Sequence, residues 1–194
     1  MMSEKPQPYD TALMKLIKGN KRFVLGKAEH PHQTVEHGKT LVETQAPFAC
    51  IVTCSDSRVP PEILFDQGLG DLFVVRVAGN IVSDTSVMGS IEYGVIQLQI
   101  PLVIVLGHTG CGAVASALSG SSYQGHIDSL LSQFKFPMLK TSLLKDPVQA
   151  VRLNVQTQVS QLLENDVFMP LIKAKQLKIQ GAVYNMETGE VEWI

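Results

Sequence analysis

Two short blocks of the chain carry residue types that could bind a metal and do chemistry. Residues 54–58 (Cys-Ser-Asp-Ser-Arg) offer Cys54 and the charged pair Asp56 and Arg58, and residues 108–111 (His-Thr-Gly-Cys) offer His108 and Cys111. Two thiolates and an imidazole form a three-ligand set for zinc, whereas a purely structural zinc site normally has four protein ligands. The two blocks therefore predict a zinc site that keeps one coordination position for a reacting molecule.

The spacing of Asp56 and Arg58 suits a partner for that chemistry. Along an extended chain alternate side chains point to the same side, so we expect Cys54, Asp56 and Arg58 to line one wall. A guanidinium beside a carboxylate lowers the carboxylate pKa and can hold both oxygens by hydrogen bonds. An ionised Asp56 can only accept hydrogen bonds, so it would orient an attacking hydroxide toward a substrate.

Each of these features also has a simpler interpretation when it is taken singly. An isolated Cys54 is more often a buried apolar residue, and an isolated Asp56–Arg58 pair is usually a local salt bridge. A zinc site that only stabilises the fold is also open, with Asp56 as its fourth ligand beside Cys54, His108 and Cys111. The combination of the two blocks favours the reactive site.

Composition and charge narrow the class of protein. The chain has 194 residues, 45% of them hydrophobic and 18% charged, which suits a single globular domain. A net charge of −2 argues against a nucleic-acid binder, and no apolar stretch reaches the ~18 residues of a membrane span. The polar N-terminus, residues 1–10, lacks the apolar core of a secretory signal, so we expect a cytoplasmic protein.

The remaining cysteine and histidines are assigned to the core and the surface. Three cysteines are too few for a disulfide framework in a chain of this size, which leaves the thiols free. Cys50 lies in an apolar run, and we interpret it as a buried core residue. His30, His32 and His37 fall in a polar segment and are interpreted as surface residues.

Alternating strand and helix signals predict an α/β fold. Four apolar runs rich in Val and Ile have the pattern of parallel strands buried on both faces, at residues 48–54, 72–78, 102–107 and 179–184. Helical signals lie between them, beginning near Pro60 and spanning about 84–99, 112–118 and 148–163. These signals indicate a mainly parallel sheet of about four strands flanked by helices.

The two ends of the chain add further elements. Residues 10–25 predict a helix, and the polar segment 27–46 predicts a loop followed by a short helix near 40–44. Residues 183–194 predict a hairpin with its turn at 187–189, which adds an antiparallel strand. Residues 120–147 indicate only a mixture of loop and helix.

The predicted elements give the two chemical blocks a common location. Cys54 ends the first predicted strand and His108 ends the third. In open α/β sheets, sites form beyond the carboxyl ends of the strands. We therefore expect the blocks to converge, although 108 − 54 = 54 residues separate them.

Taken together, the motifs Cys-x-Asp-x-Arg at 54–58 and His-x-x-Cys at 108–111 resemble those of the β-class carbonic anhydrases, for which the pair is highly specific. The stretch 71–80 (Asp-Leu-Phe-Val-Val-Arg-Val-Ala-Gly-Asn) is also similar, and the resemblance covers nearly the whole chain. It implies one domain over residues 1–194, with an N-terminal helical arm (1–46) that embraces a second subunit and an α/β zinc core (47–194). A homodimer or homotetramer is implied as well.

The resemblance also implies a ligand set and a catalytic pair. Cys54, His108 and Cys111 would hold one Zn²⁺ per subunit, and Asp56 and Arg58 would be the catalytic residues. Some members close the site by binding this aspartate to zinc as a fourth ligand, and Asp56 would take that place here.

Residues of the substrate pocket follow from the same resemblance. Gln45 matches the glutamine that donates a hydrogen bond to bicarbonate, often across the dimer interface. Phe73 and Tyr93 match positions that line the hydrophobic pocket in some members, and Gly112 matches the glycine whose backbone approaches the anion. One subgroup binds regulatory bicarbonate with a tryptophan where this chain has Ile51, so we predict that this regulatory pocket is absent.

The implied activity is the reversible hydration of carbon dioxide to bicarbonate and a proton. The partner would be this small-molecule substrate, with no nucleic acid and no membrane. Two alternatives stay open from the sequence. One is hydrolysis of a related small electrophile, carbon disulfide or carbonyl sulfide, and the other is a non-catalytic zinc module.

Overall fold

Five strands form one sheet in the order β2-β1-β3-β4-β5 in the computed structural model, which describes residues 7–134 and 146–194. Strands β1 to β4 are parallel to their neighbours, and β5 pairs antiparallel with β4. The predicted α/β class, with a mainly parallel sheet and a C-terminal antiparallel strand, is confirmed. The bounds of the strands are β1 Ala49–Thr53, β2 Leu72–Arg76, β3 Leu102–His108, β4 Lys178–Tyr184 and β5 Val191–Trp193.

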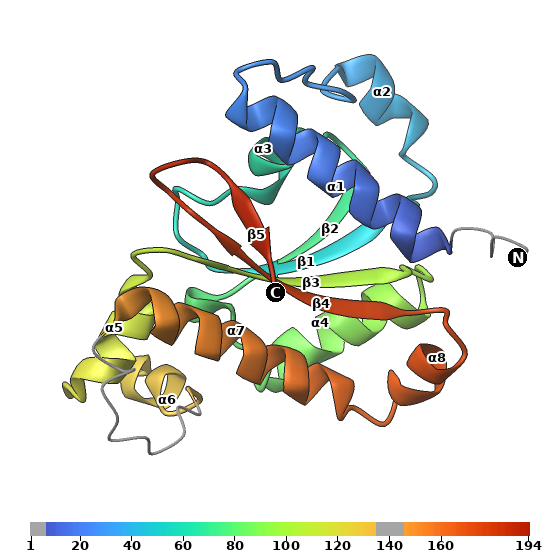
Figure 1. Cartoon of the computed structure of the whole chain (residues 1–194). Coiled ribbons are helices and arrows are strands. Elements are labelled where there is room, and N and C mark those ends of the chain that lie inside the picture. The colour runs from blue at the N-terminus through green and yellow to red at the C-terminus, as the bar shows by residue number, and fades with distance from the viewer. Residues whose placement is uncertain (1–6, 135–145) are drawn as a thin grey trace, which may run out of the picture.

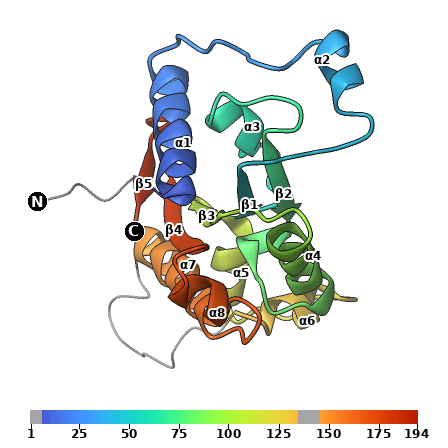
Figure 2. The same cartoon turned by 90° about the vertical axis from the view of Figure 1, so that its right-hand side faces the viewer.

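Helices cover both faces of this sheet. Helix α1 lies on one face, while α4 and α7 lie on the other (Figures 1 and 2). The bounds of the described helices are α1 Pro8–Val24, α2 Val35–Thr40, α3 Pro61–Leu64, α4 Thr85–Ile96, α5 Gly112–Ser119, α6 Ile127–Leu131, α7 Pro147–Leu163 and α8 Met169–Lys173. A single 3₁₀ turn, Ala78–Asn80, follows β2.

The two central strands explain why the sequence reads as continuous apolar runs. Every residue of β1 and of β3 is buried, because helices cover both faces of the sheet. Cys50 is fully buried within β1, as expected, and burial raises the pKa of its thiol to about 12. The core therefore fixes the positions of the strand ends that carry the two chemical blocks.

Helix α1 packs directly against its own sheet and α3. Pro8 occupies the first turn, and a reciprocal capping contact between Gln7 and Asp10 begins the helix. Leu16 is fully buried, and Gly19 lies so close to the Phe65 carbonyl that a Cβ would overlap it. This close contact brings the N-terminal helix onto the core of the same chain.

One local expectation for the helices was wrong, and one helix was not predicted. The short helix predicted near 40–44 lies instead at Val35–Thr40, because the Thr34 side chain accepts a hydrogen bond from the His37 amide and begins the helix there. Helix α8 was not predicted, and α6 occupies part of the segment that had no clear assignment. Residues 135–145 of that segment lie outside the described residues.

The C-terminal hairpin follows the prediction closely. The turn lies at residues 186–188, one residue before the expected position, and the Asn185 side chain accepts a hydrogen bond there from the Glu187 amide. Gly189 has φ +76°, a left-handed conformation that favours glycine. Val183 of β4 then pairs with Glu192 of β5. Over residues 7–134 and 146–194, no helix has the length and apolarity needed to cross a membrane.

Candidate metal centre and active site

The register of the sheet brings the two chemical blocks together. Strands β1 and β3 are direct neighbours, and Thr53 pairs with Leu106. Cys54 directly follows β1, His108 is the last residue of β3, and Cys111 immediately precedes α5. One ligand atom from each of the three residues lies within 4.8 Å of the others, and all three residues are buried. The predicted convergence is therefore observed.

The orientation of His108 leaves one ring nitrogen for a ligand. Its Nδ1 lies 2.9 Å from the Thr109 carbonyl oxygen, which makes Nδ1 the donor. Its Nε2 is then an acceptor, buried and without a hydrogen-bond partner among the described residues. An unpaired buried acceptor beside two sulfurs is costly by itself and fits a bound cation. The donor set of two sulfurs and one imidazole suits Zn²⁺.

The two sulfurs are strongly coupled to each other. The hydrogen bond between them lowers the pKa of Cys54 in spite of burial, and the hydrogen bond from the Gly79 amide acts in the same direction. The same hydrogen bond raises the pKa of Cys111 well above its ordinary value. A divalent cation that binds both sulfurs would displace the protons that they carry.

Asp56 and Arg58 meet through a tight turn. Asp56 Oδ1 accepts hydrogen bonds from the Arg58 backbone amide and from Arg58 Nε, both at 2.9 Å, and Arg58 Nη2 lies 2.7 Å from Asp56 Oδ2. The expectation of an extended segment from 54 to 58 was wrong, because the Asp56 side chain bonds the amide two residues on and turns the chain. The expected bidentate pair is nevertheless present.

The Asp56 carboxylate faces the cluster of Cys54, His108 and Cys111 and stays ionised. Its Oδ2 lies 4.0 Å from His108 Nε2. The Arg58 side chain holds the pKa of Asp56 well below its usual range, against a smaller opposing effect of burial. Asp56 is therefore an acceptor of hydrogen bonds at the edge of the cluster throughout the ordinary pH range.

Two supporting residues were missed by the sequence-based assignment of roles. The Arg76 side chain donates hydrogen bonds to the backbone carbonyls of Cys54 and Asp56. The Gly79 amide donates to Cys54 Sγ at 3.3 Å. Arg76 is the last residue of β2, and Gly79 follows that strand. Because β2 pairs with β1, both lie beside the Cys54 segment, and only the order of the strands in the sheet could have shown this.

The residues expected to line the substrate pocket fall in two places. Gly112 begins α5 beside Cys111, and a Cβ at Gly112 would meet open space. Phe73 pairs with Cys50, four residues and about 13 Å along the strands from the level of Cys54. Tyr93 stacks on Phe73 with ring centroids 6.4 Å apart, and Gln45 is exposed before β1 begins. Within one chain, these last three residues lie toward the opposite end of the sheet.

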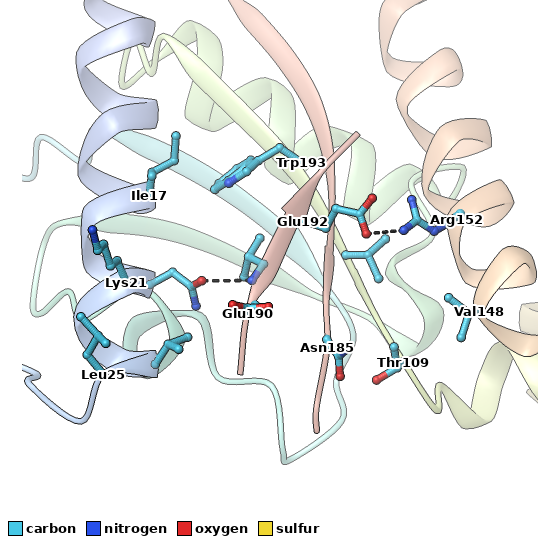
Figure 3. Close-up of a pocket in the computed structure, with 14 residues that line it drawn as sticks. Ile17, Lys21, Leu25, Thr109, Val148, Arg152, Asn185, Glu190, Glu192 and Trp193 are labelled. Atoms are coloured by element: carbon cyan, nitrogen blue, oxygen red, sulfur yellow. Dashed lines mark hydrogen bonds and ion pairs between the residues drawn. The ribbon is translucent and has the colours of Figure 1, made fainter. Parts of the chain in front are cut away.

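A groove of about 730 Å³ lies between α1, the C-terminal hairpin and α7 (Figure 3). Arg152 and Glu192 form an ion pair along it, and Trp193 and Ile17 lie farther up. Thr109 is part of its lining, but Cys54, His108 and Cys111 are not among the described residues that line it. Thr109, which directly follows His108, is the lining residue next to the cluster in the sequence.

A sequence model of the carbonic anhydrase family matches residues 49–191 of this chain, which include both chemical blocks. A carbonic anhydrase from Mycolicibacterium smegmatis is 39% identical over 196 aligned residues, which cover 96% of this chain and 94% of the relative.

Solved structures agree with this sequence similarity. The β-carbonic anhydrase CafA of Aspergillus fumigatus superposes with a TM-score of 0.74 at 29% identity, over 96% of this chain and 90% of that one. A β-carbonic anhydrase of Sordaria macrospora, described as tetrameric, superposes with a TM-score of 0.72 at 25% identity, over 95% and 97% of the two chains. This chain belongs to the β-carbonic anhydrase family, whose general activity is the hydration of carbon dioxide.

Proposed function

We propose that this chain catalyses the reversible hydration of carbon dioxide to bicarbonate and a proton, with one Zn²⁺ per subunit held by Cys54, His108 and Cys111. The observation that carries the proposal is the unpaired, buried His108 Nε2 beside two coupled sulfurs, with the ionised Asp56 4.0 Å away. When bound at these three ligands, Zn²⁺ supplies a water of lowered pKa as the nucleophile.

Asp56 orients the nucleophile in this proposal. Its carboxylate is ionised and can only accept, so it takes the remaining O–H of the attacking group as a hydrogen bond and turns a lone pair toward carbon dioxide. Arg58 binds both carboxylate oxygens and fixes their direction. A carboxylate held in this way must break two charge-assisted hydrogen bonds before it could ligate the metal, which favours the open form of the site.

Gly112 gives the product anion room to leave. It lies at the N-terminus of α5, directly after Cys111, where an added Cβ would extend into open space. We expect the bulkier variant Gly112→Val to raise KM for bicarbonate while it leaves zinc content unchanged.

The proposal is tested by zinc analysis and stopped-flow hydration on the same sample. We expect about one zinc per chain, activity that is lost on removal of the metal and regained on its return, and a Cys111→Ser variant that fails in both respects. A fully active wild-type protein without metal would overturn the proposal. Carbonyl sulfide and carbon disulfide, assayed in parallel, test for a different small electrophile as the preferred substrate.

We further propose that Gln45, Phe73 and Tyr93 serve the site of a partner subunit. This is supported by their distance from Cys54 within the chain, by the exposure of Gln45 and Tyr93, and by the tetrameric state of the Sordaria macrospora relative. Gln45 would donate a hydrogen bond to bicarbonate from across the dimer interface.

A complementation experiment tests whether Gln45 acts on the partner's site. Gln45→Ala should reduce kcat/KM by roughly tenfold or more, because it removes a hydrogen bond to a charged group. Coexpression of Gln45→Ala with Asp56→Asn should restore activity, because a mixed dimer then contains one intact site. If Gln45 acts within its own chain, every site in the mixed dimer stays defective and no activity returns.

A further inference from the structure

The peptide group of Gly79 connects the metal cluster to helix α7. On one side, the Gly79 amide donates a hydrogen bond to Cys54 Sγ at 3.3 Å. On the other side, the Gly79 carbonyl accepts a hydrogen bond from Asn154 Nδ2 at 2.9 Å. Both hydrogen bonds are buried, and Asn154 lies in the middle of α7, far from either chemical block in the sequence.

Asn154 is in turn held by a second buried amide. Gln158, one helical turn later, donates from Nε2 to Asn154 Oδ1 at 3.1 Å. The Val82 backbone amide donates to Gln158 Oε1 at 2.9 Å. Asn154 is 2% exposed and Gln158 is not exposed at all, so both amide groups are removed from solvent. We call the series from Val82 through Gln158, Asn154 and Gly79 to Cys54 the amide relay.

The direction of the amide relay is fixed at both ends. The Val82 amide can only donate, and the Gly79 carbonyl can only accept. If either side-chain amide rotated by half a turn, two acceptors or two donors would face each other in a buried environment. The two backbone groups therefore determine how Asn154 and Gln158 are oriented.

The backbone of the 3₁₀ turn at Gly79 has a conformation that only glycine fits. Gly79 has φ +71°, a region that side-chain-bearing residues rarely adopt. A Cβ at this position would also overlap the ring of Phe134. The turn thus depends on glycine, the residue type with the greatest backbone freedom. The hydrogen bond from Asn154 restrains the Gly79 backbone in the required conformation.

We propose that Asn154, supported by Gln158, is a positioning residue for the metal site, which directs the Gly79 amide at the sulfur of Cys54. A hydrogen bond to a ligating thiolate withdraws charge from the sulfur and fixes its direction toward the cation. Loss of the Asn154 contact would let the Gly79 peptide rotate, and the sulfur would lose its backbone donor. The inference rests on the proposed zinc site.

The first test measures zinc affinity by competition with a coloured chelator. In Asn154→Leu, which keeps a similar side-chain volume, we expect zinc affinity to fall by about tenfold, in the range found for groups that support metal ligands. Gln158→Met removes the group that orients Asn154 but leaves Asn154 itself, so its loss of affinity should be smaller. Gln158→Met also serves if Asn154→Leu does not fold.

The second test measures the electronic state of the ligating sulfur by absorption spectroscopy. In Co²⁺-substituted protein, the sulfur-to-cobalt charge-transfer band reports the energy of the thiolate electrons. Loss of the Gly79 hydrogen bond raises that energy, so the band of Asn154→Leu should move to longer wavelength than the band of the wild-type protein.

Leu162→Ala is the matched control. Leu162 is fully buried on α7, one turn beyond Gln158, and lies outside the amide relay. This variant should lose thermal stability through a cavity while it keeps the wild-type zinc affinity and cobalt spectrum. If Asn154→Leu and Gln158→Met match Leu162→Ala in both measurements, the inference is wrong. If the wild-type protein itself holds no zinc, the proposed function fails first.

Discussion

Two aspartates of this chain are each bound by an arginine: Asp56 by Arg58 on the rim of the metal cluster, and Asp66 by Arg22 between α3 and α1. Arg58 follows Asp56 by two residues, and 58% of its side chain is exposed. Arg22 comes from a helix 44 residues away, and only 1% of the Asp66 side chain is exposed. The same pair of residue types therefore occurs in two contrasting environments.

The remaining partners of the two carboxylates explain the contrast. Asp66 also accepts hydrogen bonds from the backbone amides of Glu29 and His30, at 3.0 and 2.9 Å, so its oxygens are fully engaged. Among the described residues, the Asp56 carboxylate accepts only from Arg58, and its Oδ2 also lies 4.0 Å from His108 Nε2. An engaged, buried carboxylate holds a loop in place, whereas an anchored carboxylate with a free direction can act on a substrate.

The largest expected effect concerns Asp56. Asp56→Asn keeps the shape of the side chain but presents an amide that can donate, so the attacking group is no longer oriented correctly. We expect kcat/KM for carbon dioxide hydration to fall by about 100-fold or more, measured by stopped flow. Zinc content and unfolding temperature should match those of the wild-type protein. An unchanged hydration rate would show that Asp56 has no catalytic role.

Asp66→Asn should have the opposite profile. The substitution removes the buried charge that pairs with Arg22 and replaces one acceptor oxygen with an amide NH₂, which leaves at least one of the bound N–H groups without its acceptor. We therefore expect a loss of about 2–3 kcal/mol in the free energy of unfolding. The unfolding temperature should fall by roughly 5–10 °C for a domain of this size. Hydration activity measured at 25 °C should be unchanged. Wild-type thermal stability in this variant would contradict the structural role of the buried pair.

The two pairs should also differ in their response to acid. Burial alone would raise the pKa of Asp66, but the Glu29 amide, Arg22 and the His30 amide outweigh burial and lower it. A lowered folded-state pKa contributes stability above the ordinary value of about 3.9, and this contribution is lost as the pH falls further. The difference in unfolding temperature between wild type and Asp66→Asn should therefore be constant from pH 7 to about pH 5 and shrink below about pH 4.

Asp56→Asn provides the control for this pH series. Because Arg58 is mostly exposed, solvent screens the Asp56–Arg58 interaction, so the stability difference from wild type should be smaller than that of Asp66→Asn at neutral pH. Because the pKa of Asp56 is lowered, this smaller difference should also shrink below about pH 4. A large, acid-sensitive stability difference in Asp56→Asn would remove the distinction between the two pairs.

The smallest expected effect is that of Arg58→Lys. Lysine keeps the positive charge but cannot bind both oxygens of Asp56 with a planar fork. Asp56 should stay ionised and lose its fixed direction, so we expect kcat to fall by roughly tenfold while KM changes little. A variant with wild-type kcat would show that charge alone, without bidentate geometry, suffices at this position.

The parts of the site that are local in sequence could be predicted. His108 and Cys111 are three residues apart in a glycine-rich turn after a buried strand, and Asp56 and Arg58 are two residues apart. Short-range spacing of this kind restricts geometry in almost any surrounding fold. The position of α2 was predicted less well. Its segment contains several polar residues, and the sequence did not show that Thr34 is the one that caps the helix.

The supporting residues could not be predicted in the same way. Arg76, Gly79 and Asn154 carry no motif that marks them as neighbours of Cys54, and their contacts depend on β2 lying beside β1 and on α7 crossing the sheet. Periodicity in the sequence gives the type of each element but not the order of strands in the sheet.

The amino-acid sequence by itself determined the candidate ligand types, the charged pair and the α/β class, because these follow from residue chemistry and from patterns a few residues long. Only the tertiary structure decided that β1 and β3 are neighbours, that α7 reaches the Gly79 peptide, and that Phe73 and Tyr93 lie away from the cluster of their own chain. These features depend on how buried surfaces far apart in the chain pack together, and packing is a property of the whole fold.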